Sequence, residues 1–396
     1  MSNIYAALEI GTSRTVLAVG ESENSGRLKV VCHAEIPSSG IRKSQILDMN
    51  QAAQSVRGVL NEIAKKDKDL SIADAFLVIS GQHVIAEVNQ GVATIETGCV
   101  TADDMREADE NARQRLPGKD RGLLDIVEQN YMVDDRGVLS PKGLAGHVLK
   151  LNTLHIHADA KQIKNATSAA GTAKIEITEP VFAATCAAEA VIDDNDRKNG
   201  VLVLDLGGGS TGYAAYCDGY LVDTGVIGVG GDHVTNDIAH AFQLQNGQSE
   251  KLKLVEASAV LTPEGEGNPR VTVPNSYQNS QTISRRALET VVNARLKELC
   301  EIIAARLEER GIAQRLHAGI VLTGGGAALR DFDELLRREF ALPVRIGRPI
   351  HVDGLENTPH PESFAAIAGA LLYAHRSGGD DQGGGGLIEK IGRIFK

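Results

Sequence analysis

Three glycine-rich turns in the chain combine small residues with hydroxyl groups or neighbouring carboxylates. The first spans residues 11–13 and comes shortly after Glu9. The second spans 207–211 and comes shortly after Asp205, and the third is the glycine run 324–326. A phosphate group is bound by several backbone N–H groups that approach it closely, which glycine permits because it has no Cβ. The three turns together therefore favour a nucleotide-binding site.

The carboxylates before the first two turns could hold a metal ion. Carboxylate oxygens are hard ligands of the kind that Mg²⁺ prefers. We expect Glu9 and Asp205 to hold Mg²⁺ through its water shell, beside a triphosphate cradled between the two turns. Hydroxyl groups would add hydrogen-bond donors: Thr12, Ser13, Ser210 and Thr211. For any single turn an ordinary hairpin or helix start is the better interpretation, so the prediction depends on the combination.

The residues around the first two turns predict the elements that position them. Residues 5–10 and 15–20 have the pattern of two strands, which the first turn joins as a hairpin. This is unlike a dinucleotide-binding site, where the glycine turn joins a strand to a helix. The same arrangement returns at 201–206 and 212–216. Two copies of strand, carboxylate, glycine hairpin and strand predict an internal duplication of one α/β unit.

The third turn has a different setting. It ends the segment 319–326 and runs into a helical pattern over 327–340, so we expect it at a helix N-terminus beside the nucleoside or its phosphates. The longest predicted helix, 284–311, precedes it and has Gly311 as its C-cap. Another helix is predicted over 49–66 from its apolar spacing.

Two further segments depart from this α/β pattern. Residues 84 to about 167 contain strand patterns at 84–88 and 148–154 and a charged helical pattern at 102–115. They predict a small separate domain inserted within the first α/β unit. Residues 377–386 consist of Gly, Asp, Ser and Gln, which predicts a flexible linker.

Composition limits the classes of function that the chain can have. Its 396 residues predict two to four structural units, and 42% hydrophobic with 23% charged residues is typical of a globular protein. A net charge of -11 and only 4% aromatic residues argue against a nucleic-acid partner. The five cysteines are scattered singly, which indicates a reduced compartment and no cysteine metal site. We see no signal peptide and no apolar run of about 18 residues, so we expect a cytoplasmic protein.

The last ten residues, 387–396, form a basic island in an acidic chain. At about 100° per residue the apolar side chains fall within an arc of roughly 120°, with the bases on the opposite side. The apolar residues are Leu387, Ile388, Ile391, Ile394 and Phe395, and the bases are Lys390, Arg393 and Lys396. This is the pattern of an interfacial helix on an anionic membrane, and the alternative is a short helix packed back on the domain. The linker weakens that alternative, because a docked helix rarely needs a long linker, and the family resemblance given below favours the membrane. A single such helix binds weakly, so stable attachment needs several copies held together.

The three turns resemble the nucleotide motifs of the actin and sugar-kinase ATPase superfamily. Residues 8–13 resemble its first phosphate motif, 205–211 its second and 322–329 its adenosine motif. The segment 179–192 and a helix through 361–369 resemble the two helices that connect the halves in this superfamily.

Other segments separate the families within this superfamily. Residues 80–84, then 131–135 and 141–146, resemble the inserted subdomain of the FtsA family, called 1C. Residues 230–239 resemble the start of subdomain 2B in the same family. The similarity to FtsA extends in register over nearly the whole chain, including the tail.

The resemblance implies an α/β, actin-like duplicated ATPase fold, with two halves around a nucleotide cleft, an inserted α+β subdomain and a C-terminal amphipathic helix. The implied divisions are subdomain 1A at 1–83 and 168–198, subdomain 1C at 84–167, subdomain 2A at 199–230 and 316–355, subdomain 2B at 231–315, a return to 1A at 356–376, a linker at 377–386 and a membrane-targeting helix at 387–396.

The resemblance also implies ATP and Mg²⁺ as ligands. Gly230 and Gly231 would approach the γ-phosphate, and Glu298 would lie near the adenosine. Glu189 would orient a water for hydrolysis, although an ordinary helix-surface Glu is the alternative there. The full set of implied nucleotide-binding residues is Gly11, Thr12, Ser13, Arg14, Gly207, Gly208, Gly209, Ser210, Thr211, Gly230, Gly231, Glu298, Gly324, Gly325, Gly326 and Leu329.

Two residues depart from the family pattern. Glu9 stands where FtsA and its relatives usually have Asp, so the carboxylate sits one methylene further out. Arg14 stands where many FtsA sequences have Lys. We expect nucleotide binding to survive both changes and ATP hydrolysis to be slow at most.

As a member of the FtsA family the protein would polymerise head to tail and tether FtsZ filaments to the inner face of the cytoplasmic membrane at the division site. Subdomain 2B would capture the C-terminal peptide of FtsZ, with Arg285 and Arg286 as candidates only because they are paired bases. Subdomain 1C would contact a neighbouring protomer or later division proteins. The alternatives are a PilM-like scaffold of a type IV pilus, a sugar-kinase-type phosphotransferase, and a bacterial actin such as MreB.

Overall fold

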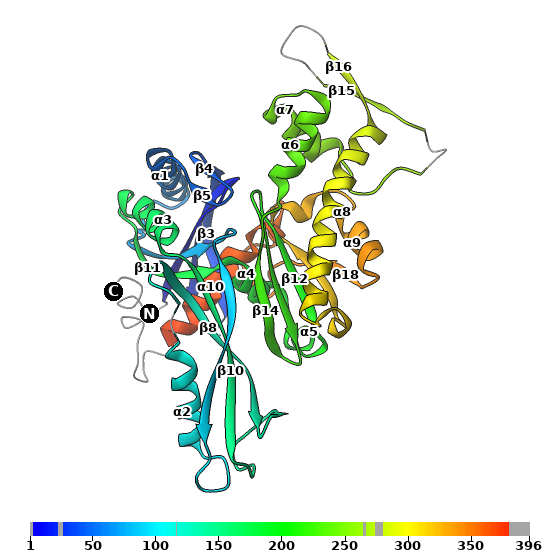
Figure 1. Ribbon diagram of the computed structural model, residues 1–396. Coiled ribbons are helices and arrows are strands. Elements are labelled where there is room, and N and C mark those ends of the chain that lie inside the picture. The colour runs from blue at the N-terminus through cyan, green and yellow to red at the C-terminus, as the bar shows by residue number, and fades with distance from the viewer. Residues whose placement is uncertain (1–2, 23–26, 116, 264–266, 274–279, 380–396) are drawn as a thin grey trace.

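The computed structural model describes residues 3–22, 27–115, 117–263, 267–273 and 280–379. Two α/β halves lie side by side, and a third, smaller sheet extends below them (Figure 1). Among the described residues no helix has the length and apolar character needed to cross a bilayer.

The two halves repeat one strand arrangement. In the first half β1 (Ile4–Ile10) pairs antiparallel with β2 (Arg14–Ser22) and parallel with β6 (Asp74–Ile79). In the second half β12 (Val201–Leu206) pairs antiparallel with β13 (Thr211–Cys217) and parallel with β17 (Gly319–Thr323). Both predicted hairpins and the predicted internal duplication are confirmed.

Further strands complete the two sheets. The sheet of the first half has the order β11-β6-β1-β2-β3-β19, and that of the second half has the order β14-β13-β12-β17-β18. The added strands are β3 (Leu28–Pro37), β11 (Glu176–Phe182), β19 (Val352–Asp353), β14 (Tyr220–Ile227) and β18 (Val344–Ile346). A two-stranded sheet, β4 (Ile41–Arg42) and β5 (Gln45–Ile46), precedes the first helix.

Helices cover the sheets and connect the halves. The first half carries α1 (Met49–Lys66) and α3 (Ala160–Thr172), which contact each other. The second half carries α5 (Asp194–Asn199), α6 (Gly231–Phe242), α7 (Asn246–Glu256), α8 (Arg285–Glu309) and α9 (Phe332–Phe340). It also carries the hairpin β15 (Arg270–Val273) and β16 (Gln281–Ser284), and a short 3₁₀ turn η1 (Ala313–Arg315). The predicted helices 49–66 and 284–311 are confirmed, and Gly311 follows α8 with a φ of 65°.

The two central helices, α4 (Ala183–Val191) and α10 (Ala365–Gly379), pack closely against each other. Almost every residue of α4 is buried, and five of its nine residues are alanine, which lets other backbone come close. A Cβ added to Gly369 in α10 would overlap the backbone of Cys186 in α4. The crossing therefore depends on a residue without a side chain.

A third sheet forms the insert, which we define as β7 to β10 with α2. Its order is β7-β10-β8-β9, and all pairs are antiparallel. The elements are β7 (Ile85–Thr94), α2 (Ala102–Arg113), β8 (Arg121–Val133), β9 (Arg136–Val138) and β10 (Val148–Asp159). Helix α2 begins with a capping box between Thr101 and Asp104 and packs on β7 and β10. The predicted span 84–167 would also take in the first part of α3, which packs on α1 of the first half.

Three sequence predictions about element boundaries are wrong. The segment 179–192 is not one helix, because 179–182 are the end of β11, of which 180–182 pair with β6, before α4 begins. The helix predicted over 327–340 begins only at Phe332, since the 3₁₀ turn η2 (Gly325–Ala328) and a left-handed Asp331 with a φ of 60° interrupt it. Helix α10 follows the 3₁₀ turn η3 (Pro361–Phe364) and extends to Gly379, into the predicted linker.

The crossing of α4 and α10 gives a test with a matched pair of substitutions. We expect Gly369→Ala to destabilise the protein by about 2 to 3 kcal/mol, because the new methyl group overlaps the backbone of α4. Gly171→Ala, in helix α3, should instead be neutral or stabilising by up to about 1 kcal/mol, since a Cβ there meets nothing within 4 Å. Urea unfolding of both variants checks this, and equal midpoints would contradict the close crossing.

Candidate functional site

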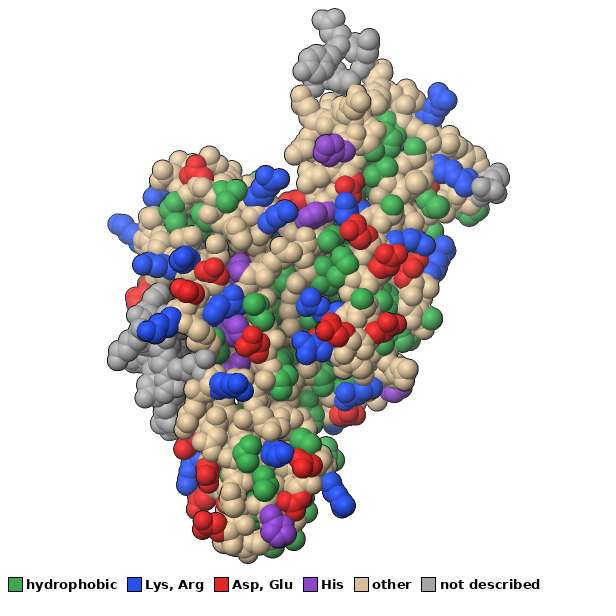
Figure 2. Space-filling view, viewed as in Figure 1, with side chains coloured by type: hydrophobic (Ala, Val, Ile, Leu, Met, Phe, Trp, Pro, Cys, Tyr) green, Lys and Arg blue, Asp and Glu red, His purple; other side chains and the backbone are tan. Residues whose placement is uncertain are grey.

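A cavity of about 540 Å³ lies between the two halves. Its walls come from the turn between β1 and β2, the turn between β12 and β13, the loop after β14 and the loop after β17. In the space-filling view a notch separates the lobe that carries α1 from the lobe that carries α6 and α7 (Figure 2). On that face acidic and basic side chains are interspersed (Figure 2).

The first two glycine turns meet across this cavity. Each is closed by its own backbone hydrogen bond, from Gly11 N to Arg14 O at 3.0 Å and from Gly207 N to Ser210 O at 3.0 Å. They approach so closely that a Cβ on Gly209 would lie 2.5 Å from Thr12 Oγ1. The structure thus brings together the two turns that the sequence predicted to face a phosphate chain.

The loop before α6 joins the same wall. Gly231 N donates to Gly207 O at 2.9 Å, and Asp232 N donates to Gly208 O at 2.8 Å. Helix α6 begins at Gly231, so its N-terminus lies beside the second turn. The positive end of a helix dipole favours an anion at this place.

The predicted metal carboxylates, Glu9 and Asp205, both line the cavity. Burial raises the pKa of Glu9, although Arg14 opposes the shift. Burial, with the Glu9 carboxylate as the next cause, raises the pKa of Asp205 to about 7. Two buried carboxylates with raised pKa values, in a space lined by glycine, are relieved by a bound cation, so the residues fit a magnesium ion with its phosphate ligand.

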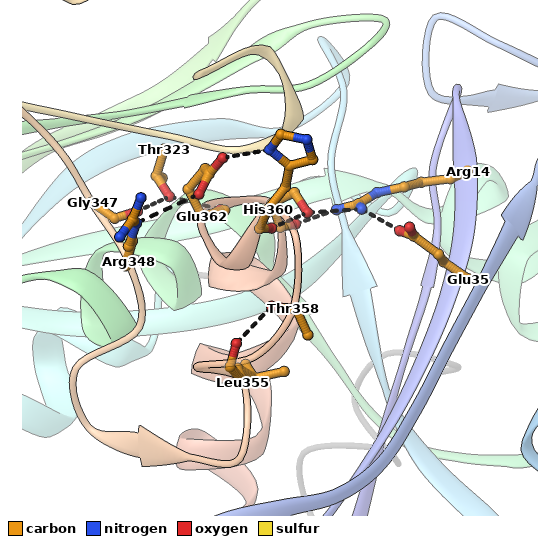
Figure 3. Close-up of polar contacts among 10 residues, drawn as sticks. Arg14, Glu35, Thr323, Gly347, Arg348, Leu355, Thr358, His360 and Glu362 are labelled. Atoms are coloured by element: carbon orange, nitrogen blue, oxygen red, sulfur yellow. Dashed lines mark hydrogen bonds and ion pairs between the residues drawn. The ribbon is translucent and has the colours of Figure 1, made fainter. Parts of the chain in front are cut away.

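Arg14 has a different role from the simple phosphate contact that was predicted. It lines the cavity, but its guanidinium pairs with Glu35 and donates to Ser363 Oγ at 3.0 Å and to the Ser363 carbonyl (Figure 3). The same group lies over the Phe364 ring, 5.1 Å from its centroid. Arg14 therefore connects the strand after the first phosphate turn to η3, which directly precedes α10.

The third glycine turn is fixed to the same segment of chain. Thr323 Oγ1 donates to Gly347 O at 2.8 Å and to Glu362 O at 2.9 Å (Figure 3). Gly324 N also donates to Glu362 O, at 3.1 Å. Residues 360–364 thus hold two of the three turns, because Arg14 reaches them from one side and Thr323 from the other.

Sequence reasoning missed several residues of the wall. Lys253 on α7 is buried. Its Nζ donates to Gly231 O at 3.1 Å and to Thr235 Oγ1 at 2.9 Å. The same Nζ forms an ion pair with Glu250 at 2.8 Å. The apolar end is lined by Leu254, Leu296, Leu299 and Leu329, of which only Leu329 was predicted. The spacing of Glu250 and Lys253 on one helical face was the available signal, but it is common on exposed helices.

Most predicted nucleotide residues line the cavity: Gly11, Thr12, Ser13, Arg14, Gly207, Gly208, Gly209, Ser210, Gly230, Gly231, Gly324, Gly325, Gly326 and Leu329. Two do not. Thr211 is buried and its Oγ1 donates to Val229 O at 2.7 Å, which fixes the loop after β14. Glu298 is half exposed and pairs with Arg295, while its neighbours Leu296 and Leu299 face the cavity.

The structure does not bring Glu189, the predicted catalytic residue, to the cavity. The N-terminal residues of α4, Ala183 and Ala184, line the cavity, and Glu189 lies about 9 Å further along the helix axis. Its carboxylate pairs with Arg197 at 2.7 Å and with Arg376. Burial alone would raise the pKa of Glu189, but these two arginines hold it below its usual value. Glu189 connects α4, α5 and α10 on the side away from the cleft.

The predicted membrane residues lie outside the described part of the chain. They are Leu387, Ile388, Lys390, Ile391, Arg393, Ile394, Phe395 and Lys396. Among the described residues no group of three or more His, Cys, Asp or Glu side chains is arranged to hold a metal ion. Because Mg²⁺ in nucleotide sites usually binds one or two carboxylates and keeps several waters, Glu9 and Asp205 would leave its other positions to phosphate and water.

Two family models match the chain. The model described as "Cell division protein FtsA" matches residues 202–369, and the model described as "SHS2 domain inserted in FTSA" matches residues 81–157. The second match covers most of the insert.

Relatives named "Cell division protein FtsA" are similar over almost their whole length. That of Pseudomonas aeruginosa is 30% identical over 372 residues, which are 93% of this chain and 89% of the relative. That of Neisseria meningitidis serogroup B is 28% identical over 402 residues, 98% of this chain and 97% of the relative. That of Escherichia coli K12 is 28% identical over 386 residues, 94% of this chain and 91% of the relative.

Two solved structures show the same fold. The "PilM-PilN type IV pilus biogenesis complex" has a TM-score of 0.66 at 17% identity and covers 94% of this chain and 98% of the solved chain. MreB5 of Spiroplasma citri bound to ADP has a TM-score of 0.56 at 15% identity, over 96% of this chain and 99% of the solved chain. The fold is therefore that of the actin-like ATPases, as the three glycine turns predicted.

The buried carboxylates give a pH-dependent prediction. Because Asp205 holds its proton to about pH 7 in the folded chain and ionises well below that when unfolded, it makes the ligand-free protein less stable as pH rises from about 4 to 7. We therefore expect Asp205→Asn to raise the melting temperature at pH 8 by a few degrees and to raise it little at pH 4. The same variant should lose Mg²⁺-dependent nucleotide binding.

Thermal unfolding without Mg²⁺ or nucleotide, at several pH values, measures this effect. Asp103→Asn is the control, since the Asp103 side chain is 81% exposed and should change neither quantity. A melting temperature for Asp205→Asn below that of the wild type at pH 8 would contradict the prediction.

Proposed function

This chain belongs to the FtsA family of cell division proteins, and we propose that it binds ATP with Mg²⁺ in its cleft and tethers FtsZ filaments to the cytoplasmic membrane. Its cell division role follows from the relative of Pseudomonas aeruginosa, which it matches over 93% of its length. The nucleotide, membrane and FtsZ parts of the proposal rest on the residues argued below.

The observation that carries the nucleotide part is the meeting of two glycine hairpins at the ends of two equivalent strands. The turns at 11–13 and 207–211 supply backbone N–H groups and hydroxyls from two sides, and Gly230 and Gly231 add the N-terminus of α6. The apolar wall around Leu329 would take the adenine. The MreB5 neighbour was solved with ADP and, in a second structure, with AMPPNP.

Glu9 and Asp205 would hold the metal ion through its water shell. A bound Mg²⁺ supplies charge neutralisation for the phosphate oxygens. The protein itself fixes the phosphate turns, excludes water with its apolar wall and keeps both carboxylates in place. Glu9 stands where the family usually has Asp, and Glu189, the residue predicted to orient a water, faces away from the cleft, so we propose slow hydrolysis at most.

Stable membrane attachment would rely on self-association of the protein. Head-to-tail polymers of an actin-like chain would place many tails on one membrane surface, so that weak single contacts add up. The tail segment 387–396 has three bases and one acid, against a net charge of -11 for the whole chain. Attraction of the bases to anionic headgroups, with insertion of the apolar face, would hold the protein on the cytoplasmic face at the division site.

We place the FtsZ contact on subdomain 2B, which contains α6, α7, β15, β16 and the start of α8. Arg285 lies at that start, and its Nη2 pairs with Glu256 Oε2 at 2.7 Å, so it also secures α8 to α7. Arg286 is the next residue of the same turn. The two residues are candidates for the contact because they are adjacent bases in an acidic chain. The insert is left to contact a neighbouring protomer or later division proteins.

The membrane proposal is tested by sedimentation with vesicles that contain phosphatidylglycerol, in the presence of ATP and Mg²⁺. We expect the full chain to pellet with the vesicles and a chain that ends at Gly386 to stay in the supernatant. Ile394→Asp should lose most of the binding because it places a charge on the apolar face, whereas Glu389→Gln on the polar face should retain it. Higher salt should weaken binding.

Added FtsZ should then pellet with the same vesicles only when the full chain is present. If the full chain and the shortened chain behave alike, the tail does not anchor the protein, and a scaffold without a membrane helix becomes the better account. If the chain pellets but FtsZ does not, the anchor stands and the FtsZ contact is wrong.

A further inference from the structure

Strand β14 is an edge strand of the sheet of the second half, yet its open side is covered. It contacts β7, β8 and β10 of the insert, which follows β6 of the first half in the chain (Figure 1). Leu154 and Ile156 of β10 are buried in one cluster with Leu221 of β14. The insert therefore packs against both halves, although the chain connects it to only one of them.

At the end of β14 away from the cleft, the insert holds the strand by a buried side chain. Gln129 on β8 is only 8% exposed. Its Nε2 donates to Leu221 O at 2.8 Å and to Val222 O at 3.1 Å. Both donor hydrogens of one amide are thus directed at the backbone of the other half. Separating them without water would leave buried polar groups unpaired, which is unfavourable.

At the end of β14 beside the cleft, a second glutamine occupies the space next to the strand. A Cβ on Gly228 would overlap the side-chain amide of Gln82. Gly228 follows β14 directly and precedes Gly230 and Gly231, which line the nucleotide cavity. Ser80, two residues before Gln82, lines the same cavity. The segment that leads into the insert therefore lies beside the cavity at Ser80 and against the residue after β14 at Gln82, whose side chain is exposed.

Arg121 connects the two segments of chain that carry Gln82 and Gln129. Arg121, at the start of β8, donates from Nη2 to His83 O at 2.8 Å and from Nε to His157 Nδ1 at 2.8 Å. This ties the segment next to Gln82 to the β8–β10 pair, and Gln129 lies eight residues further along β8. A shift of the insert must therefore move both contacts with β14 together.

We propose that Gln82 and Gln129 are positioning residues, through which the insert holds β14 and the loop 228–231 in the place that a bound nucleotide requires. The inference rests on the proposed nucleotide binding. Rotation of the second half against the first must break the Gln129 contacts or carry the insert along. Nucleotide retention and the orientation of the insert are then coupled, and the coupling acts in both directions.

The test uses the full chain with Mg²⁺ and a fluorescent ATP analogue, displaced by excess ATP in a stopped-flow instrument. Gln129→Met keeps the side-chain volume and removes both donors. We expect it to speed nucleotide dissociation about tenfold, with the association rate and the binding stoichiometry unchanged. Gly228→Ala, which displaces Gln82, should have a similar effect on dissociation.

Gln90→Met is the matched control. Gln90 lies on β7 of the same sheet, is exposed, and donates to Asn152 Oδ1 at 2.9 Å, so its amide is bound within the insert. Its dissociation rate should equal that of the wild type. Hydrogen exchange gives a second readout: ATP should slow exchange of the amides of Gln82 and His83 in the wild type and in Gln90→Met, but much less in Gln129→Met.

The possible results separate the inference from the function on which it rests. A wild-type chain that retains no nucleotide would overturn the proposed nucleotide binding and the inference with it. A wild type that binds, with an unchanged dissociation rate in Gln129→Met, would overturn the inference alone. A lower stoichiometry with an unchanged dissociation rate would mean that Gln129 serves only folding, which also overturns the inference.

Discussion

At two places the chain approaches a glycine so closely that a Cβ would not fit, and this close approach imposes the residue type found there. At the crossing of the central helices, Gly369 lies against the backbone of Cys186 in an alanine-rich helix. At the cleft, Gly209 lies against Thr12. Close packing leaves no room for an added methyl group at either place, so each of them requires a residue without a side chain. The phosphate turns can face each other because the helices below them cross so tightly.

The close packing of the two halves also buries two carboxylates in the cleft. Glu9 and Asp205 lie at equivalent strand ends, and the internal duplication brings them to one cavity with raised pKa values. Other charges near them are neutralised within the chain, as Arg14 is by Glu35. The unliganded cleft therefore contains an unfavourable pair of carboxylates, which a cation relieves. Because of these two carboxylates, the protein without a bound cation is less stable than it would be with an apolar cleft.

The sequence predicted those parts of the site that are made by backbone. Glycine turns at strand ends have a local signature, so the hairpins at 11–13 and 207–211 and most of their residues were placed correctly. Side chains on helices were predicted poorly, because one residue turns a helix by about 100° and the burial of each face depends on tertiary packing. Glu298 and Glu189 thus face away from the cavity, and Lys253 lines it without any motif. Strand β8 was missed because one part of it packs on β14 and the rest is half exposed, so its burial does not simply alternate.

An insert that covers an edge strand does two things at once. It removes the open edge of β14, which would otherwise be free to pair with another chain. It also joins the second half to the insert, since β14 pairs with β13 on one side and contacts β8 of the insert on the other. A small domain attached through loops alone could move without any effect on the cleft. Here the buried amide of Gln129 and the segment around Gln82 lie at opposite ends of one strand, so the insert is not free to move independently of the phosphate turns.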